Sequence, residues 1–182
     1  MSLALVSLLL LSIDRVLLSG SRYLSRTTLI TELQQACVMA SSRLVTELLE
    51  SNAGCVRGDS LNQRYVTFGT PRNDKGETTF DPTSGELNWY NIVGYYVAMQ
   101  GDEPSLFRKN EAISPTATAP PSIPASYDDA YWKGYAQPTR MVAHRVYFVE
   151  VVSSTNINVI IGTKSRDGRF LINIKTKLKA RN

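Results

Sequence analysis

The sequence is poor in the residues that build most catalytic and metal sites. Its 182 residues include one histidine, His144, and two cysteines, Cys37 and Cys55. A lone histidine without a neighbouring cysteine cluster is a poor metal ligand. The sequence also has no glycine-x-serine-x-glycine nucleophile elbow and no glycine-rich loop that could cradle a phosphate. We therefore expect a protein that is not an enzyme and that has no cofactor, metal or small-molecule substrate.

Four polar residues in a turn-rich stretch are the best remaining candidates for a calcium site. Asn73, Asp74, Glu77 and Asp81 carry the oxygen ligands that calcium prefers. Their spacing does not match the EF-hand loop. We expect them to be solvated turn residues instead.

The scarcity of cysteine excludes a disulfide framework. Cys37 falls within a predicted helix, and Cys55 lies just beyond the end of that helix. The helical residues from Cys37 to Asn52 span roughly 22 Å, whereas a disulfide needs Cα atoms within about 7 Å of each other. We predict two free thiols, with Cys37 packed as a small hydrophobic residue.

Proline is absent from residues 1–52, and this stretch predicts one long helix with two different halves. Residues 1–25 begin with a segment that is apolar on every side. The candidate membrane or filament-core residues in it are Leu3, Leu5, Val6, Leu8, Leu9, Leu10, Leu11 and Ile13. Residues 26–52 are amphipathic, with apolar side chains at steps of three and four. The stripe is Leu29, Leu33, Ala36, Ala40, Leu44 and Leu48, of which Leu29, Leu33, Ala40, Leu44 and Leu48 are the candidate contacts with the head.

The apolar half suits lipid or a bundle of identical helices. A membrane-spanning helix needs about 20 apolar residues. Met1–Ile13 supplies thirteen, and Val16–Leu18 adds three after two charged residues, so the apolar run looks as though it has lost its beginning. Nothing basic precedes it, which distinguishes it from a secretory signal. Ser19-Gly20-Ser21 is the weakest helical point, because glycine costs about 1 kcal/mol relative to alanine.

Residues 53–182 predict a globular head rich in antiparallel β-structure, which makes the fold class α+β. The predicted strands are 64–68, 92–99, 105–109, 145–152, 156–163 and 169–180. In the last strand, Phe170, Ile172, Ile174 and Leu178 share one face. The opposite face carries the basic residues Arg169, Lys175, Lys177, Lys179 and Arg181. We expect the apolar face to pack on the stripe of the helix.

Residues 114–139 predict a long loop that contains five prolines. Its second half holds four aromatic residues, Tyr127, Tyr131, Trp132 and Tyr135. These rings either cover an apolar surface of the head or present a partner-binding patch, because large amphipathic rings serve both purposes.

Three parts of the sequence together resemble the type IV pilin-like proteins, in particular the J-type minor pseudopilins of type II secretion. The first is the apolar helix of residues 1–18. The second is Thr31-Glu-Leu-Gln-Gln-Ala-Cys-Val-Met-Ala and the amphipathic turns that follow it. The third is a head pattern made of Val66-Thr-Phe68, Asp81-Pro-Thr-Ser-Gly-Glu86, Trp89, Tyr95-Tyr96 and Leu106-Phe-Arg108. The family's processing motif, a glycine followed by phenylalanine-threonine-leucine and a glutamate, is missing, so no processing residue is carried over.

The resemblance implies a pilin-like fold and a non-enzymatic subunit of a type II secretion pseudopilus or a type IV pilus. It implies a single-pass anchor in the bacterial inner membrane, with the head in the periplasm or outside the cell. The implied partners are other pilin or pseudopilin subunits, the inner membrane, and a secreted substrate or DNA.

Two other classes of function fit parts of the sequence. One is a membrane-anchored periplasmic binding protein that binds DNA through the basic patch Lys175, Lys177, Lys179 and Arg181. The other is a secreted enzyme whose N-terminal segment is removed as a signal peptide.

Overall fold

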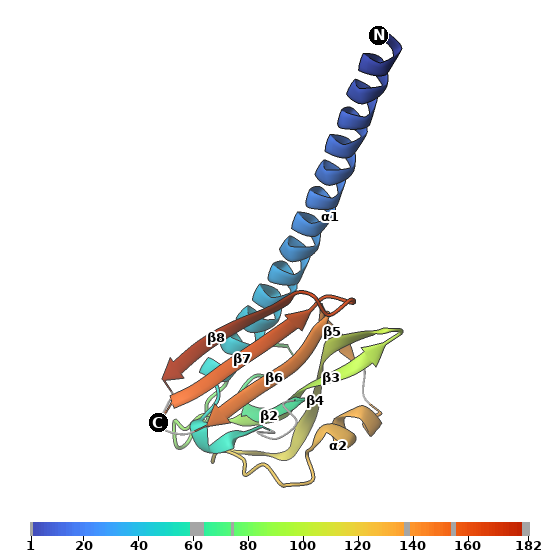
Figure 1. The fold of residues 1–182 in the computed structure, drawn as a ribbon. Helices are drawn as coiled ribbons and strands as arrows, with labels where there is room; N and C mark the ends of the chain where they lie inside the picture. Colours follow the sequence, from blue (N-terminus) through green and yellow to red (C-terminus); the bar gives the residue numbers. More distant parts are fainter. Residues whose placement is uncertain (1, 59–63, 74, 137–138, 154–155, 180–182) are drawn as a thin grey trace.

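One helix of 48 residues, α1 (Ser2–Leu49), runs through the whole length of the molecule. The computed structural model describes residues 2–58, 64–73, 75–136, 139–153 and 156–179. The first half of α1 projects away from the head, and the second half lies against the sheets (Figure 1). The helix passes through Ser19-Gly20-Ser21 without a break, and Ser19 Oγ donates to Val16 O at 3.2 Å. It ends before Asn52, whose side chain caps the short 3₁₀ helix η1 (Ala53–Cys55).

The head contains two antiparallel sheets. The five-stranded sheet has the order β1 (Val56–Gly58), β2 (Tyr65–Thr70), β3 (Trp89–Gln100), β4 (Glu103–Ala117) and β5 (Arg140–His144). The three-stranded sheet has the order β6 (Val146–Ser153), β7 (Asn156–Lys164) and β8 (Leu171–Lys179). These elements confirm an α+β architecture of one long N-terminal helix with antiparallel sheets.

The prediction of one irregular loop over residues 114–139 is wrong in two places. Residues 114–117 belong to β4, and a short helix, α2 (Asp129–Gly134), interrupts the rest. Because β5 pairs with β4 only from Ser105 to Arg108, the later part of β4 has one unpaired edge. Proline is tolerated on such an edge, where it removes no ladder hydrogen bond.

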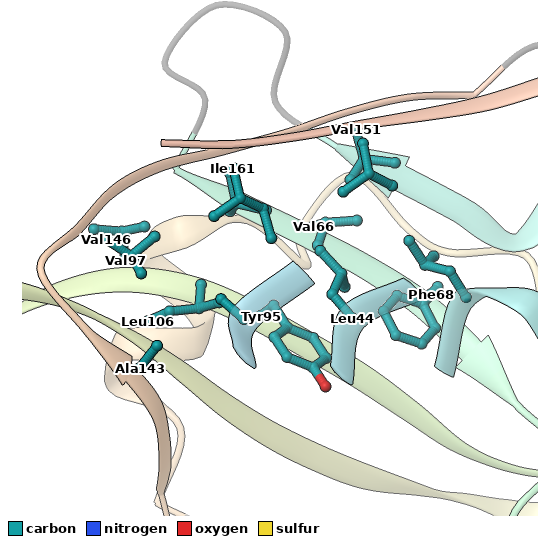
Figure 2. Packing of buried hydrophobic residues seen from close by; sticks show 14 of the residues in the cluster. Leu44, Val66, Phe68, Tyr95, Val97, Leu106, Ala143, Val146, Val151 and Ile161 are labelled. Atoms are coloured by element: carbon teal, nitrogen blue, oxygen red, sulfur yellow. The ribbon is translucent and has the colours of Figure 1, made fainter. Parts of the chain in front are cut away.

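The main core lies between the two sheets, with the second half of α1 packed into it. Leu44 contributes to a cluster that includes Val66 and Tyr95 of one sheet and Val151 and Ile161 of the other (Figure 2). Alternation along β8 matches the expected pattern, since Leu178 is buried, Ile172 and Ile174 are half-buried, and the residues between them are exposed or half-buried. The helix is therefore a structural component of the head.

Two polar contacts fix the position of α1 over β7. The buried thiol of Cys37 donates to Ile161 O at 3.2 Å, and Thr163 Oγ1 donates to Leu33 O at 3.2 Å. Cys37 and Cys55 are both buried and free, as predicted. Burial raises the pKa of the Cys37 thiol above its usual range, so it stays protonated and can act as the donor.

Leu44→Ala tests the packing of the helix into the head. Leu44 is fully buried, so its truncation should lower the free energy of unfolding by about 2–5 kcal/mol in urea denaturation. Val38→Ala is the control, because Val38 lies on the same helix with 55% of its surface exposed and should change stability by less than about 0.5 kcal/mol. Equal effects of the two substitutions would mean that α1 does not organise the core.

Candidate assembly interface

The first half of α1 exposes large apolar side chains over much of its surface. Leu9, Leu10 and Leu11 are each 62% exposed, and successive positions on a helix point about 100° apart. The remaining large apolar side chains exposed on this half are Ile13, Val16, Leu17, Leu18, Tyr23 and Leu24. The side chains of Leu3, Leu5, Val6 and Leu8 lie outside those that the structure describes.

Exposed apolar side chains in this number are unusual for a monomeric soluble protein, where large apolar patches mark a contact with another protein or a membrane. Charged residues interrupt the apolar surface at Asp14, Arg15 and Arg22. Arg15 and Arg22 share one side of the helix with Ser12 and Ser19, because these positions are three and four residues apart. Among the residues that the structure describes, no helix combines the length and apolarity needed to cross a bilayer. The described surface is thus largely apolar, with one polar stripe.

The boundary between the exposed and the buried halves falls where the sequence places it, close to residue 26. Arg26 stacks its guanidinium over the ring of Phe170, 4.9 Å from the ring centroid. Leu29 is half-buried, and beyond it Leu33, Ala40, Leu44 and Leu48 are buried. The structure therefore brings all five candidate head contacts to one side of the helix.

The aromatic residues of 127–135 lie on the other face of the five-stranded sheet, away from α1. Trp132 is fully buried, in a second cluster with Tyr65, Ile92 and Tyr96. Its Nε1 donates to Thr67 Oγ1 at 2.8 Å. A buried ring cannot contact a partner, so the candidate role of Trp132 in recognition is wrong, and this ring covers the sheet.

Three tyrosines surround Trp132 and remain half-buried. Tyr131 lies 4.5 Å from Tyr127 and 5.4 Å from Tyr135 between ring centroids. The Tyr131 hydroxyl donates to the carboxylate of Glu111. Burial and then the neighbouring carboxylate raise the pKa of Tyr131 above its usual range. The Tyr131 hydroxyl is thus engaged within the head.

Lys109 is an anchor of α2 that sequence reasoning missed. It is 4% exposed, pairs in register with Gly94, and donates from Nζ to Trp132 O at 2.8 Å and to Tyr135 O. Carbonyl oxygens at the end of a helix carry partial negative charge, so they stabilise a buried ammonium group. The contact joins positions 23 and 26 residues apart, so no local sequence pattern predicts it.

The basic face of β8 faces solvent. Lys175, Lys177 and Lys179 are exposed, whereas Arg181 lies outside the described residues. Because β8 is an edge strand, lysines there also hinder pairing with strands of other molecules.

The polar side chains of the candidate calcium site accept hydrogen bonds from the backbone of their own turns. Asn73 Oδ1 accepts from Lys75 N and Glu77 N at 2.9 Å, and Asp81 Oδ1 accepts from two backbone N–H groups at 2.8 Å. These backbone donors lower the pKa of Asp81. Asp74 lies outside the described residues, and within them no three acidic, histidine or cysteine side chains converge on a metal position.

Comparison of the chain with protein-family models, with curated proteins and with solved structures finds no match.

Two glycine substitutions test how α2 docks on the sheet. A Cβ at Gly94 would lie 2.1 Å from the Trp132 ring, so Gly94→Ala should displace α2 and lower the free energy of unfolding by about 1–3 kcal/mol or more. Gly134→Ala is the control, because no atom lies within 4 Å of its added Cβ and alanine favours helix. Urea denaturation should separate the two variants. Unchanged stability of Gly94→Ala would exclude this packing.

Proposed function

We propose that this chain is a pilin-like subunit with a pilin-like fold, a minor pseudopilin or minor pilin, which has no enzymatic activity. It assembles through α1 into a type II secretion pseudopilus or a type IV pilus. The observation that carries the proposal is the division of one unbroken helix into two halves: residues 29–48 help form the core of the head, and residues 9–24 expose a largely apolar surface.

The physical basis of assembly is a transfer of the apolar half of α1 between two similar surroundings. Before assembly, this half anchors the chain in the bacterial inner membrane, with the head in the periplasm. In the filament, the same surface packs against identical helices and the head faces outward. Both surroundings are apolar, so the transfer costs little free energy.

The two adjacent charges, Asp14 and Arg15, fit this arrangement. Consecutive residues on a helix point to different sides, so they do not face each other. In a bundle of identical helices, the carboxylate of one copy can pair with the guanidinium of another. This pairing would offset the cost of placing the charges in an apolar surrounding.

Charges introduced into the exposed half of α1 test the proposal. Leu10→Glu with Leu17→Glu should abolish filaments in electron micrographs, because unpaired carboxylates would be buried between helices. The melting temperature of the head should not change, since neither side chain contacts it.

Gln34→Glu with Ser42→Glu is the matched control. Both positions are exposed and lie on the half of α1 that packs on the head. This variant adds the same charge and should still assemble. Normal filaments from the Leu10 and Leu17 variant would contradict the proposal.

A second candidate is a membrane-anchored periplasmic binding protein that binds DNA. The exposed lysines at 175, 177 and 179 on β8 favour it. Binding of this kind should weaken with salt and disappear when the three lysines become glutamine.

A further inference from the structure

A polar pocket of about 360 Å³ opens on the head beside the second half of α1, on the same face of the five-stranded sheet as the main core. Its walls come from α1, from the turn after β2, and from β3, β4 and β5. The charged side chains that line it are Arg43, Glu47, Arg72, Lys75, Arg108 and Arg140.

The lining of the pocket thus contains five cationic side chains and one carboxylate, that of Glu47. The carboxylate of Glu47 pairs with two of these cations. Arg108 Nε lies 3.0 Å from both of its oxygens, and Arg43 Nε lies 3.7 Å from one of them. Arg72 pairs with Glu50, which does not line the pocket. Within the described part of the chain, no carboxylate forms an ion pair with Lys75 or Arg140. The pocket therefore keeps an excess of positive charge even when Glu50 is counted.

One residue that lines this pocket, Asn91, has a buried acceptor without a partner. Asn91 is 5% exposed, and its Nδ2 donates to Arg72 O at 2.8 Å, which fixes the orientation of the amide. Its Oδ1 is buried and accepts no hydrogen bond from the residues that the structure describes. Arg43 Nε is likewise buried and lies too far from Glu47 for a hydrogen bond. Buried polar atoms are normally paired, so these two indicate a ligand that both accepts and donates.

We propose that the pocket binds a soluble phosphomonoester. A phosphomonoester near neutral pH carries negative charge for the arginines and lysine, and a hydroxyl group of its organic part can donate to Asn91 Oδ1. Sulfate carries a similar charge but has no hydroxyl group. The pocket exceeds the size of a phosphate ion, so it has room for a hydroxylated organic group beside Thr70 and Asn110. This site is independent of the proposed function, because none of its residues lies on the exposed half of α1.

The test is isothermal titration calorimetry of the full chain in a non-ionic detergent. The titrants are inorganic phosphate, glycerol 3-phosphate and sulfate. Glycerol 3-phosphate should bind at one site per chain. Sulfate should bind at least tenfold more weakly than glycerol 3-phosphate, because it leaves Asn91 Oδ1 without a donor.

Lys75→Gln with Arg140→Gln should weaken the binding of phosphate and glycerol 3-phosphate at least tenfold, because it removes the two cations that no carboxylate pairs with. Lys175→Gln with Lys177→Gln is the control, since it removes the same charge from β8 and should leave the affinity unchanged. Saturable binding with this pattern would support the site.

Three results would overturn the proposal. The first is no saturable binding of either phosphate compound at millimolar concentration. The second is an equal loss of affinity in the two double variants, which would indicate non-specific attraction to net positive charge. The third is an absence of binding to glycerol 3-phosphate together with vesicle binding that needs phosphatidic acid in phosphatidylcholine vesicles and that Lys75→Gln with Arg140→Gln abolishes, which would assign the site to a lipid headgroup.

Discussion

The burial of one stripe of α1 between two sheets is the contact on which the rest of the head depends. Leu44 and Leu48 belong to a cluster to which both sheets contribute, so neither sheet has a complete core without the helix. The chain crosses from one sheet to the other at Arg145, which adopts a left-handed backbone conformation with φ 57°. Such a conformation is costly for a residue other than glycine. Its guanidinium pairs with Glu32 of α1 at 3.0 Å and with Glu103 at 3.2 Å, which fixes this crossing beside the helix.

The same arrangement leaves the other half of the helix without an intramolecular partner. A helix of 48 residues is about 72 Å long. The sheets pack on one side of the part that follows residue 28, and the described side chains before it are exposed. The head is therefore complete as a folded unit, whereas the apolar surface of residues 9–24 needs a second apolar environment. Pilin-like assembly supplies that environment with other copies of the same helix, which is why we favour it.

The features that could be predicted from the sequence are those that repeat with a regular period. The stripe from Leu29 to Leu48 and the alternation along β8 depend only on the geometry of a helix and a strand, and both were correct. The role of Trp132 depended on Gly94, 38 residues earlier, which leaves the space that the ring fills. Contacts of this kind join positions with no local relation, so a single sequence could not distinguish a covering ring from a binding one.

The cationic pocket could not be predicted from the sequence for the same reason. Arg43 and Arg108 come from α1 and β4, and only the fold places them around Asn91. Strand β4 continues past Pro115 because one of its edges is unpaired there, and this can be recognised only when the order of the strands in the sheet is known. The division into two sheets could not be predicted either, because the pattern of a strand does not show which other strands pair with it.

Sedimentation velocity without detergent tests most directly whether one helix serves both the head and assembly. It compares the full chain with a chain that contains residues 23–182, and a thermal melt of the shorter chain accompanies it. The account predicts that the full chain associates, and that the shorter chain is monomeric with a single cooperative melting transition. A full chain that stays monomeric, or a shorter chain that aggregates or melts without cooperativity, would contradict it.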